Sequence, residues 1–485
     1  MRSTLLACAC ALAAGPSFAS EFLVTSAADD GPGSLRAAVA AANAQPGPDT
    51  IRLQVGEIIL SAGTLLVTDD LTVLGIGPNQ TRLVNAAPVT PVADYDRGRV
   101  FLLRGTVERQ LAVTLRELSF EQGHTRGTVD GNGIVTDYGE GGAVRSEYTD
   151  LVVEACSFVA NHSASDGGGL WQYEGDLTLL RTQFASNVAE FHGGGLHVTG
   201  GDARLERVRF VGNEAPFGGA IATIDTGTRL SLREAQLGYN RAGHTGGAGY
   251  LAVSALDIAS TTVNENVSGQ PQGAGLYLVA PLDAPGTPMQ IANSTFSGNG
   301  TPADVGASAG AAITLARGRL LLRNSTVYGN PVAAPGTPPR VGGGIFVAGG
   351  DNHLEMESVL VAAGDVVRDI ESEGDDNSIR ARHSLMQVAP VPGTLNAGDS
   401  ENLFGVDPRL GPLATNGGFT WTHAIAADSP ARDRGDNIAP RLSTDQRGVD
   451  ATLGLRFHRY YGRPDIGAYE YYGEDTIFYS DFDDH

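Results

Sequence analysis

The stretch RFVGNEAPFGGAI, residues 209–221, holds the two short patterns that decide the fold. One is F-x-x-N, made by Phe210 and Asn213, and the other is G-G-A-I, made by residues 218–221. Both patterns recur at intervals of roughly 26 residues, which predicts a structural repeat. The residues that close successive glycine turns are Val144, Leu170, Leu196, Ile221, Tyr250, Leu276, Ile313 and Ile345. The asparagines of the other marker are Asn161, Asn187, Asn213, Asn240, Asn266, Asn299 and Asn330.

Each repeat is built from short runs in which apolar and polar residues alternate, such as ARLERVRF at 203–210. This pattern predicts one coil of a parallel β-helix per repeat, with each strand lying on the equivalent strand of the next coil. The sequence therefore predicts an all-β, right-handed, single-stranded parallel β-helix with N- and C-terminal caps. The phenylalanines of the marker are expected in an interior column. Asn161, Asn187, Asn213 and Asn240 are expected to form a hydrogen-bonded ladder at a turn.

Composition and charge exclude several classes of partner. The formal net charge is −22, and all 33 basic residues are arginines. A negative field of that size repels nucleic acid, so no nucleic-acid partner is expected. No stretch holds about 18 uninterrupted apolar residues, so no transmembrane segment is expected. No zinc motif or calcium loop is present, so no metal site or cofactor is predicted, although surface carboxylates could hold Ca²⁺. The sequence leaves the oligomeric state open.

The first 19 residues predict export. They combine a basic start, an apolar run over residues 5–14 and small residues at the expected cleavage position, as a secretory signal peptide does. Two of the three cysteines lie in this segment, so Cys156 would remain alone in the mature chain, where no intrachain disulfide can form. A lone cysteine of this kind is most often a small buried apolar residue.

Three segments resemble known families. The G-G-A-I and F-x-x-N tetrapeptides of residues 140–347 resemble the passenger repeats of chlamydial polymorphic outer-membrane proteins. FLVTSAADDGPGSLRAAVAAANAQPGPDTI, residues 22–51, is similar to the CSLREA module of secreted bacterial β-helix proteins, with Gly33 and Ala37 at its Cys and Glu positions. FGVDPRLGPLATNGGFTWTHAIAADSPARDRGD (404–436), TDQRG (444–448) and RPDIGAYE (463–470) resemble the C-terminal region of choice-of-anchor Q proteins.

These resemblances imply a pectin-lyase-like β-helix that is secreted or held on the cell surface or outer membrane of a Gram-negative bacterium. They also suggest the domain division. We predict a signal peptide at 1–19, a CSLREA-like cap at 20–50, the β-helix at 51–395, a choice-of-anchor Q-like region at 396–472 and an acidic tail at 473–485. The region after residue 400 is expected to cap the far end of the helix, because exposed terminal coils aggregate.

Three consecutive coils carry an unusual set of polar and aromatic side chains beside the glycine turn. Neighbours of a core residue point outward in a strand, so equivalent neighbours should share one outer face. The predicted face consists of Arg145, Glu147, Trp171, Tyr173, His197 and Thr199, with Glu140, Asp166 and His192 at its edge. Rings that stack on sugar faces, beside carboxylates and arginine, are typical of glycan-binding surfaces. The glycan-binding candidates are therefore Glu140, Arg145, Asp166, Trp171, Tyr173, His192 and His197.

The alternative for this face is an ordinary surface whose rings are covered by a loop such as 121–140. The leading functional hypothesis is an exported or cell-surface protein with an adhesive or structural role, which contacts glycans or a host or matrix surface. The second is a polysaccharide lyase or glycoside hydrolase, in which Glu140 and Asp166 would be the two carboxyl groups or Arg145 the base. The third is a passive spacer. The sequence identifies no catalytic residue.

Overall fold

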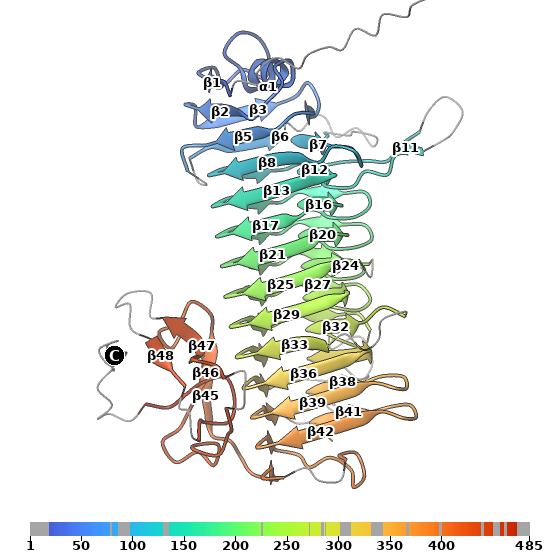
Figure 1. The fold of residues 1–485 in the computed structure, drawn as a ribbon, viewed down its shortest axis with the longest axis vertical. Coiled ribbons are helices and arrows are strands. Elements are labelled where there is room, and N and C mark those ends of the chain that lie inside the picture. The colour runs from blue at the N-terminus through green and yellow to red at the C-terminus, as the bar shows by residue number, and fades with distance from the viewer. Residues whose placement is uncertain are drawn as a thin grey trace, which may run out of the picture.

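The computed structural model describes residues 19–77, 80–85, 98–129, 135–224, 227–270, 272–282, 286, 288–300, 312–330, 343–364, 368–396, 400–437, 441–449, 456–459 and 463–472. The described chain forms a straight stack of β coils, with a short helix at one end and a smaller β region beside the other half (Figure 1). The stack confirms the predicted parallel β-helix. The predicted signal peptide, apart from Ala19, and the predicted acidic tail lie outside the described residues, so both stay predictions.

Each full coil contributes one strand to each of three long parallel sheets, and five coils add a short strand to a fourth. Sheet 1 contains β1 (Glu21–Val24), β2 (Asp49–Leu53), β5 (Leu71–Leu74), β8 (Leu111–Arg116), β13 (Thr149–Glu154), β17 (Leu177–Leu180), β21 (Asp202–Glu206), β25 (Arg229–Arg233), β29 (Ala255–Ala259), β33 (Pro288–Ala292), β36 (Arg319–Arg323), β39 (His353–Glu357) and β42 (Ser378–Arg382). Sheet 2 contains β3 (Glu57–Leu60), β6 (Arg82–Asn85), β9 (Ser119–Glu121), β14 (Ser157–Val159), β18 (Gln183–Ala185), β22 (Arg209–Val211), β26 (Gln236–Gly238), β30 (Thr262–Asn264), β34 (Thr295–Ser297), β37 (Thr326–Tyr328), β40 (Leu360–Ala362), β43 (Leu385–Met386) and β44 (Leu403–Phe404).

The remaining strands form sheets 3 and 4 and three antiparallel pairs. Sheet 3 contains β4 (Leu65–Val67), β7 (Phe101–Arg104), β12 (Val144–Glu147), β16 (Leu170–Tyr173), β20 (Leu196–Thr199), β24 (Ile221–Thr223), β28 (Gly249–Ala252), β32 (Leu276–Val279), β35 (Ile313–Arg317), β38 (Ile345–Val347) and β41 (Ile370–Ser372). Sheet 4 contains β15 (His162–Ser163), β19 (Val188–Ala189), β23 (Glu214–Ala215), β27 (Arg241–Ala242) and β31 (Val267–Ser268). The pairs are β10 (Thr128–Val129) with β11 (Val135–Asp137), β45 (Leu410–Ala414) with β46 (Thr422–Ile425), and β47 (Thr444–Val449) with β48 (Arg456–His458).

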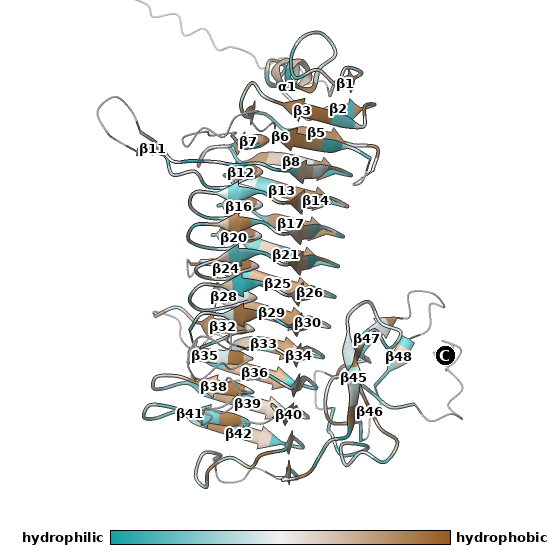
Figure 2. Ribbon diagram, turned by 180° about the vertical axis from the view of Figure 1, so that it is seen from behind, coloured by the Kyte–Doolittle hydropathy of each residue, from teal (hydrophilic) through white to brown (hydrophobic). Residues whose placement is uncertain are grey.

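The interior of the stack is filled by columns of apolar side chains. Polar and apolar residues alternate along many of the strands, so one side of each strand faces this interior (Figure 2). The rings of Phe158, Phe184 and Phe210 are fully buried and stack with centroid separations of 4.5 and 4.7 Å. Phe120 extends the column, with its ring centroid 4.8 Å from that of Phe158. This column is the predicted one.

The predicted asparagine ladder is present and runs through seven coils. Its members are Asn161, Asn187, Asn213, Asn240, Asn266, Asn299 and Asn330, and all are buried. In each step the side-chain Nδ2 donates to Oδ1 of the next asparagine at 2.9–3.0 Å. Each Nδ2 also donates to the backbone oxygen of the core residue one coil earlier, as Asn213 does to Phe184. The ladder therefore satisfies polar groups that burial removes from water.

Glycine is required at the corner before β24 of sheet 3, where residues 218 and 219 form the G-G pair. Gly218 has φ +64°, and a Cβ there would lie 2.3 Å from the carbonyl oxygen of Ile221. A Cβ on Gly219 would lie 2.4 Å from the carbonyl oxygen of Gly247 in the next coil. The G-G pair therefore combines a left-handed turn with a close approach of two coils.

The N-terminal cap is the helix α1 (Leu35–Asn43), which begins after Ser34. The Ser34 hydroxyl accepts a hydrogen bond from the Ala37 backbone N–H at 3.2 Å, as an N-cap residue does. The buried face of α1, which includes Leu35 and Val39, covers the first coil. No helix of the described residues is long and apolar enough to cross a membrane.

Most of the C-terminal region does not cap the far end, contrary to the prediction. Residues 387–396 cover that end instead, where Asn396 N–H donates to the Ile379 carbonyl at 2.9 Å. Residues 403–404 add a last short strand, β44, beside β43, and the region that follows turns back and lies along the flank of the lower coils (Figure 1). Several of its hydrogen bonds are made to Thr side chains of sheet 2, which point outward in register. Thr262 Oγ1 donates to the Trp421 carbonyl at 2.6 Å, and Thr295 Oγ1 donates to Gln446 Oε1 at 2.6 Å.

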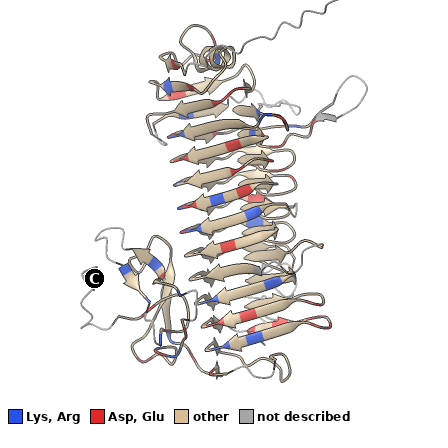
Figure 3. Cartoon of the chain, in the orientation of Figure 1, with Lys and Arg blue, Asp and Glu red and all other residues tan. Residues whose placement is uncertain are grey.

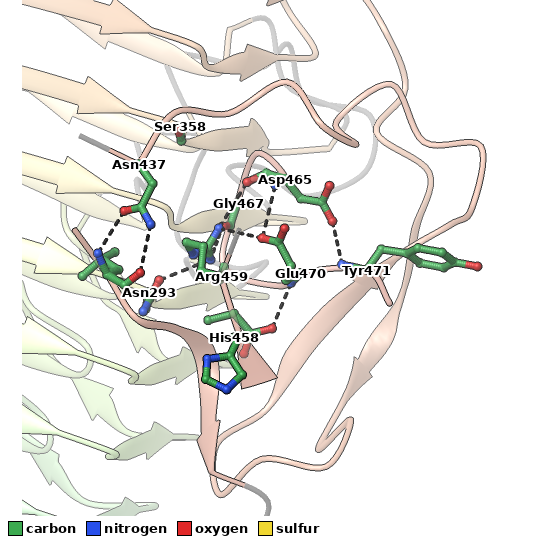
Figure 4. Close-up of polar contacts among 12 residues, drawn as sticks. Asn293, Ser358, Asn437, His458, Arg459, Asp465, Gly467, Glu470 and Tyr471 are labelled. Carbon is green, nitrogen blue, oxygen red and sulfur yellow. Dashed lines mark hydrogen bonds and ion pairs between the residues drawn. The ribbon is translucent and has the colours of Figure 1, made fainter. Parts of the chain in front are cut away.

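A buried ionic cluster completes this flank contact (Figure 4). Arg459, whose side chain is 0% exposed, lies 3.3 Å from Glu470 Oε2 and donates to Asn293 Oδ1 of the β-helix at 3.2 Å. Arg447 pairs with buried Asp445 at 2.6 Å and lies over the Phe457 and Tyr469 rings. Asp445 and Arg447 belong to TDQRG, and Tyr469 and Glu470 belong to RPDIGAYE, so the two motifs contribute to this cluster together with Arg459, which lies between them.

Candidate functional site

The outer side of sheet 3 carries the predicted candidate residues. Strand register places Arg145, Trp171 and His197 in one column on β12, β16 and β20. Glu147, Tyr173 and Thr199 form the next column. A third column consists of Glu140, Asp166 and His192. It is aligned by backbone hydrogen bonds from the Gly141 N–H to the Asp166 carbonyl and from the Gly167 N–H to the His192 carbonyl. We call the surface made by Glu140, Arg145, Glu147, Asp166, Trp171, Tyr173, His192, His197, Phe217, Tyr250 and Tyr277 the aromatic face.

Arg145 is the centre of an ion-pair cluster at the N-terminal end of the aromatic face. Its guanidinium contacts Glu140 Oε2 at 2.8 Å, Asp137 Oδ1 at 3.1 Å and Glu147 Oε1 at 2.5 Å. It also lies over the Trp171 ring, 5.1 Å from the centroid. Three carboxylates and the Trp171 ring therefore surround the Arg145 guanidinium, and its role as a lyase base stays a prediction.

Asp166 is clamped by the two histidines of the neighbouring coil. Its Oδ1 accepts hydrogen bonds from the His192 backbone N–H at 3.0 Å and contacts His192 Nδ1 at 2.8 Å. His197 Nδ1 lies 3.3 Å from Oδ2. Burial raises the pKa of the Asp166 carboxyl, but the hydrogen bonds and ion pairs with His192 and His197 outweigh it and hold the pKa far below its usual range. Asp166 is therefore a permanent anion at neutral pH.

His197 differs from the prediction of an outward, accessible residue. It points out of the helix, yet it is only 1% exposed because His192 and Asp166 lie beside it. Its Nε2 lies 3.3 Å from the Thr199 hydroxyl. His197 is therefore a buried contact of the Asp166 carboxylate. His192, with a quarter of its side chain exposed, is the histidine that a ligand can reach.

The register of one later coil differs from the sequence alignment. Gly249, and not Tyr250, pairs with Ile221 at the turn-closing position. A Cβ at Gly249 would lie 3.0 Å from a Leu276 methyl group, so this inward position has little room for a side chain. Tyr250 consequently lies outside, between Ala222 and Tyr277 in the column of Trp171. The aromatic face is therefore longer than predicted.

The added part of the aromatic face is neutral and apolar. Phe217 stacks between His192 and His244, with centroid distances of 5.4 and 5.0 Å. Phe217 and Tyr250 make an edge-to-face contact, with their ring centroids 5.8 Å apart. Tyr250 and Tyr277 stack with nearly parallel planes at 5.3 Å. Sequence reasoning missed this part because the alignment placed Tyr250 in the core. The signal that could have revealed it was Tyr277, which the same alignment places at the outward position of the next coil.

The rings of the aromatic face stack mainly on one another. Trp171 is covered by Arg145 and lies parallel to Tyr173 at 5.7 Å. Tyr250 and Tyr277 occupy adjacent coils, so parallel rings 5.3 Å apart turn their faces along the helix axis and their edges outward. The face differs here from the predicted platform of open rings, because it presents ring edges and hydroxyl groups that can hydrogen-bond a ligand.

Two carboxyl groups on adjacent coils have opposite pKa shifts. Burial raises the pKa of the Glu140 carboxyl, which is 8% exposed, although Arg145 lowers it. Asp166, in the next coil of the same column, is held ionised. Opposite shifts in neighbouring carboxyl groups are typical of acid and base pairs. In the part of the chain that the structure describes, no group of three or more His, Cys, Asp or Glu side chains is arranged to hold a metal ion.

The comparisons with known proteins add only distant structural similarity. No protein-family profile and no curated protein matches the chain. The similar solved structures include ORF18 of Geobacillus virus E2, at 10% identity and a TM-score of 0.34, covering 74% of this chain and 61% of that one. They also include tailspike protein 3 of bacteriophage CBA120, at 10% identity and a TM-score of 0.31, covering 76% of this chain and 56% of that one. The chain thus spans less than two thirds of either phage protein. The resemblances of the repeats and terminal modules to named families stay predictions.

Proposed function

We propose that this protein is an exported β-helix rod that contacts glycans through the aromatic face and has an adhesive or structural role at a bacterial surface. The observation that carries the proposal is a line of partly exposed rings beside ionic groups on sheet 3, running from Trp171 to Tyr277. Tyrosine hydroxyls, the His192 imidazole and the Asp166 carboxylate are the donors and acceptors that sugar hydroxyls pair with.

The two parts of the aromatic face suit different parts of a carbohydrate. The ionic end, around Arg145 and Asp166, offers charge-assisted hydrogen bonds. The neutral end, around Phe217 and Tyr250, offers apolar ring edges for the C–H groups of a sugar. A rod supports such contact well, because its rigid coils hold the side chains at fixed spacing of about 4.8 Å.

The test compares retention on immobilised neutral and uronate glycans for the native chain and two variants. Trp171→Ala removes a ring at the centre of the ionic end and is expected to reduce retention at least fivefold. Phe404→Ala, which removes an exposed ring on β44, is the matched control and should leave retention unchanged. Absence of retention by the native chain on every glycan tested would contradict the proposal and favour a spacer.

Hydrolysis is the second candidate, because Glu140 and Asp166 form a carboxyl pair with opposite pKa shifts one coil apart. That spacing suits a retaining glycosidase, whose carboxyl groups lie about 5 Å apart. In this case the native chain would release new reducing ends from a bound glycan. Glu140→Gln would abolish release and keep retention. A native chain that binds glycan and releases no reducing ends would exclude hydrolysis.

A further inference from the structure

A cleft lies between the flank of the helix and the C-terminal region. Its volume is about 570 Å³, in the range of small-molecule sites, which often lie at domain boundaries. Its lining residues are Arg181, Thr182, Gln183, Arg207, Arg209, Glu234, Phe419, Arg447 and Val449. The floor comes from the coils of β18 and β22, and the wall comes from residues 419–449 of the folded-back region. The cleft exists only because that region docks on the flank.

The cleft is basic in a strongly acidic protein. Arg207 pairs with Glu234 at 2.6 Å. Arg181 pairs with Glu154, but the same carboxylate also pairs with Arg116, so it cannot neutralise both. Arg209 makes no ion pair with any residue in the described ranges. Positive charge therefore exceeds negative charge at the floor of the cleft, although the whole chain carries a net charge of −22.

The same cleft has an apolar wall. The Arg209 guanidinium lies over the half-buried Phe419 ring, 5.6 Å from its centroid. Val449 is 47% exposed at the rim. A free guanidinium next to a ring and an aliphatic side chain matches a ligand that carries an anionic group on a partly apolar ring. An inorganic anion would use the arginines and leave the wall uncovered.

We infer that this cleft binds an acidic oligosaccharide, with a carboxylate or sulfate of the sugar on Arg209 and a sugar ring against Phe419. This site is separate from the aromatic face and does not depend on it. The two sites lie on different sides of the rod, since one is on sheet 3 and the other is on the flank of sheet 2. Arg447 serves the wall structurally, because its guanidinium is bound to Asp445 and to the Glu470 carbonyl.

The test measures affinity of the full chain for a galacturonate oligomer and for a neutral galactose oligomer of equal length. We expect the acidic oligomer to bind at least tenfold more tightly, and its affinity to fall as salt is raised. Arg209→Gln is expected to weaken binding of the acidic oligomer at least fivefold, and Phe419→Ala to weaken it severalfold. Arg229→Gln, an exposed arginine on sheet 1, is the matched control and should bind like the native chain.

Several outcomes would overturn this inference. Equal affinity of the native chain and Arg209→Gln for the acidic oligomer would show that Arg209 forms no binding site. Equal losses of affinity in Arg209→Gln and Arg229→Gln would indicate only a diffuse electrostatic effect. Equally tight binding of inorganic sulfate or of a glutamate peptide of the same charge would overturn the sugar assignment. Trp171→Ala should bind the acidic oligomer normally, so failure of the aromatic face and failure of the cleft are distinguishable. Thermal unfolding of Phe419→Ala shows whether the region stays docked.

Discussion

Asn213 shows how one residue type fixes the position of a whole coil. Its Oδ1 accepts from the backbone N–H and the Nδ2 of Asn187, and its Nδ2 donates to Asn240 and to the Phe184 carbonyl. Asn213→Ala would leave these buried groups without partners, each at a cost of about 1–3 kcal/mol. We expect a loss of about 3 kcal/mol or more in the free energy of unfolding, measured by urea denaturation.

The control for this prediction is Gln290→Ala, which removes an exposed amide from β33. It is expected to change the free energy of unfolding by less than about 0.5 kcal/mol. An Asn213→Ala variant as stable as Gln290→Ala would mean that the ladder is dispensable.

Single residues also show where sequence reasoning succeeds and fails. Phe158, Phe184 and Phe210 could be placed because a second marker, the asparagine, fixes their alignment. Tyr250 could not, because the coil before it is longer and an apolar tyrosine beside Gly249 looks like a core residue. The burial of His197 was equally unpredictable, since it depends on the conformations of His192 and Asp166 in neighbouring coils.

The glycine corner is the element that sets the distance between coils. Gly219→Ala would place a Cβ 2.4 Å from the Gly247 carbonyl oxygen and 2.6 Å from that of Arg241, both of which are backbone atoms. The coils would have to move apart, so we expect a loss of at least about 2 kcal/mol and a lower Tm. Gly411→Ala, where the nearest atom would be 3.5 Å away, is the control in a calorimetric melt. Equal melting temperatures for both variants would contradict the close approach.

The docked C-terminal region should respond to pH through Glu470. Burial raises the pKa of its carboxyl to about 8, because Arg459 offsets only part of the burial cost and Asp465 and Asp445 add negative charge. The folded state therefore holds this proton more tightly than the unfolded state, whose pKa is near 4.5. Stability is highest below that value and falls as pH rises towards 8, by up to about 1.4 kcal/mol per pH unit.

Glu470→Gln mimics the protonated carboxyl and should remove this dependence. Denaturation at pH 5 and pH 8 should show that the native chain loses more stability than the variant. Glu206→Gln, an exposed carboxyl on β21, should behave like the native chain. Parallel losses in the native chain and Glu470→Gln would show that another group carries the effect.

The position of this region illustrates which elements sequence patterns do not predict. TDQRG and RPDIGAYE stood out as motifs, but their partners lie far away in sequence, as Gln446 and Thr262 do at a separation of 184 residues. A sequence repeat reveals which residues contact each other one coil apart. A contact on the flank of the helix is marked in the sequence only by scattered Ser and Thr residues, which form no repeat. The cleft beside Arg209 arises from that contact, so it could not be predicted either.

At the scale of the whole molecule, the residues that stabilise the stack differ from the residues that form its outer surface. The interior columns and the asparagine ladder hold the coils together, and the outer faces are free to vary. Acidic and basic residues are mixed along the strands of sheet 1 (Figure 3), whereas rings gather on sheet 3 and arginines gather in the flank cleft. The proposed contacts therefore depend on the outer residues of adjacent coils lying in register.

Disulfide trapping tests that register most directly. Thr178 and Arg204 are paired outward residues of β17 and β21, so cysteines at both positions should form an intrachain disulfide on mild oxidation, detected by mass spectrometry. Cysteines at Thr178 and Ser231 lie two coils apart, at about 9.6 Å, and should not. Burial raises the pKa of Cys156 to about 12, so it should stay reduced. A disulfide between positions 178 and 204 and none between 178 and 231 is the predicted result; the reverse would contradict the stacked coils on which both proposed sites depend.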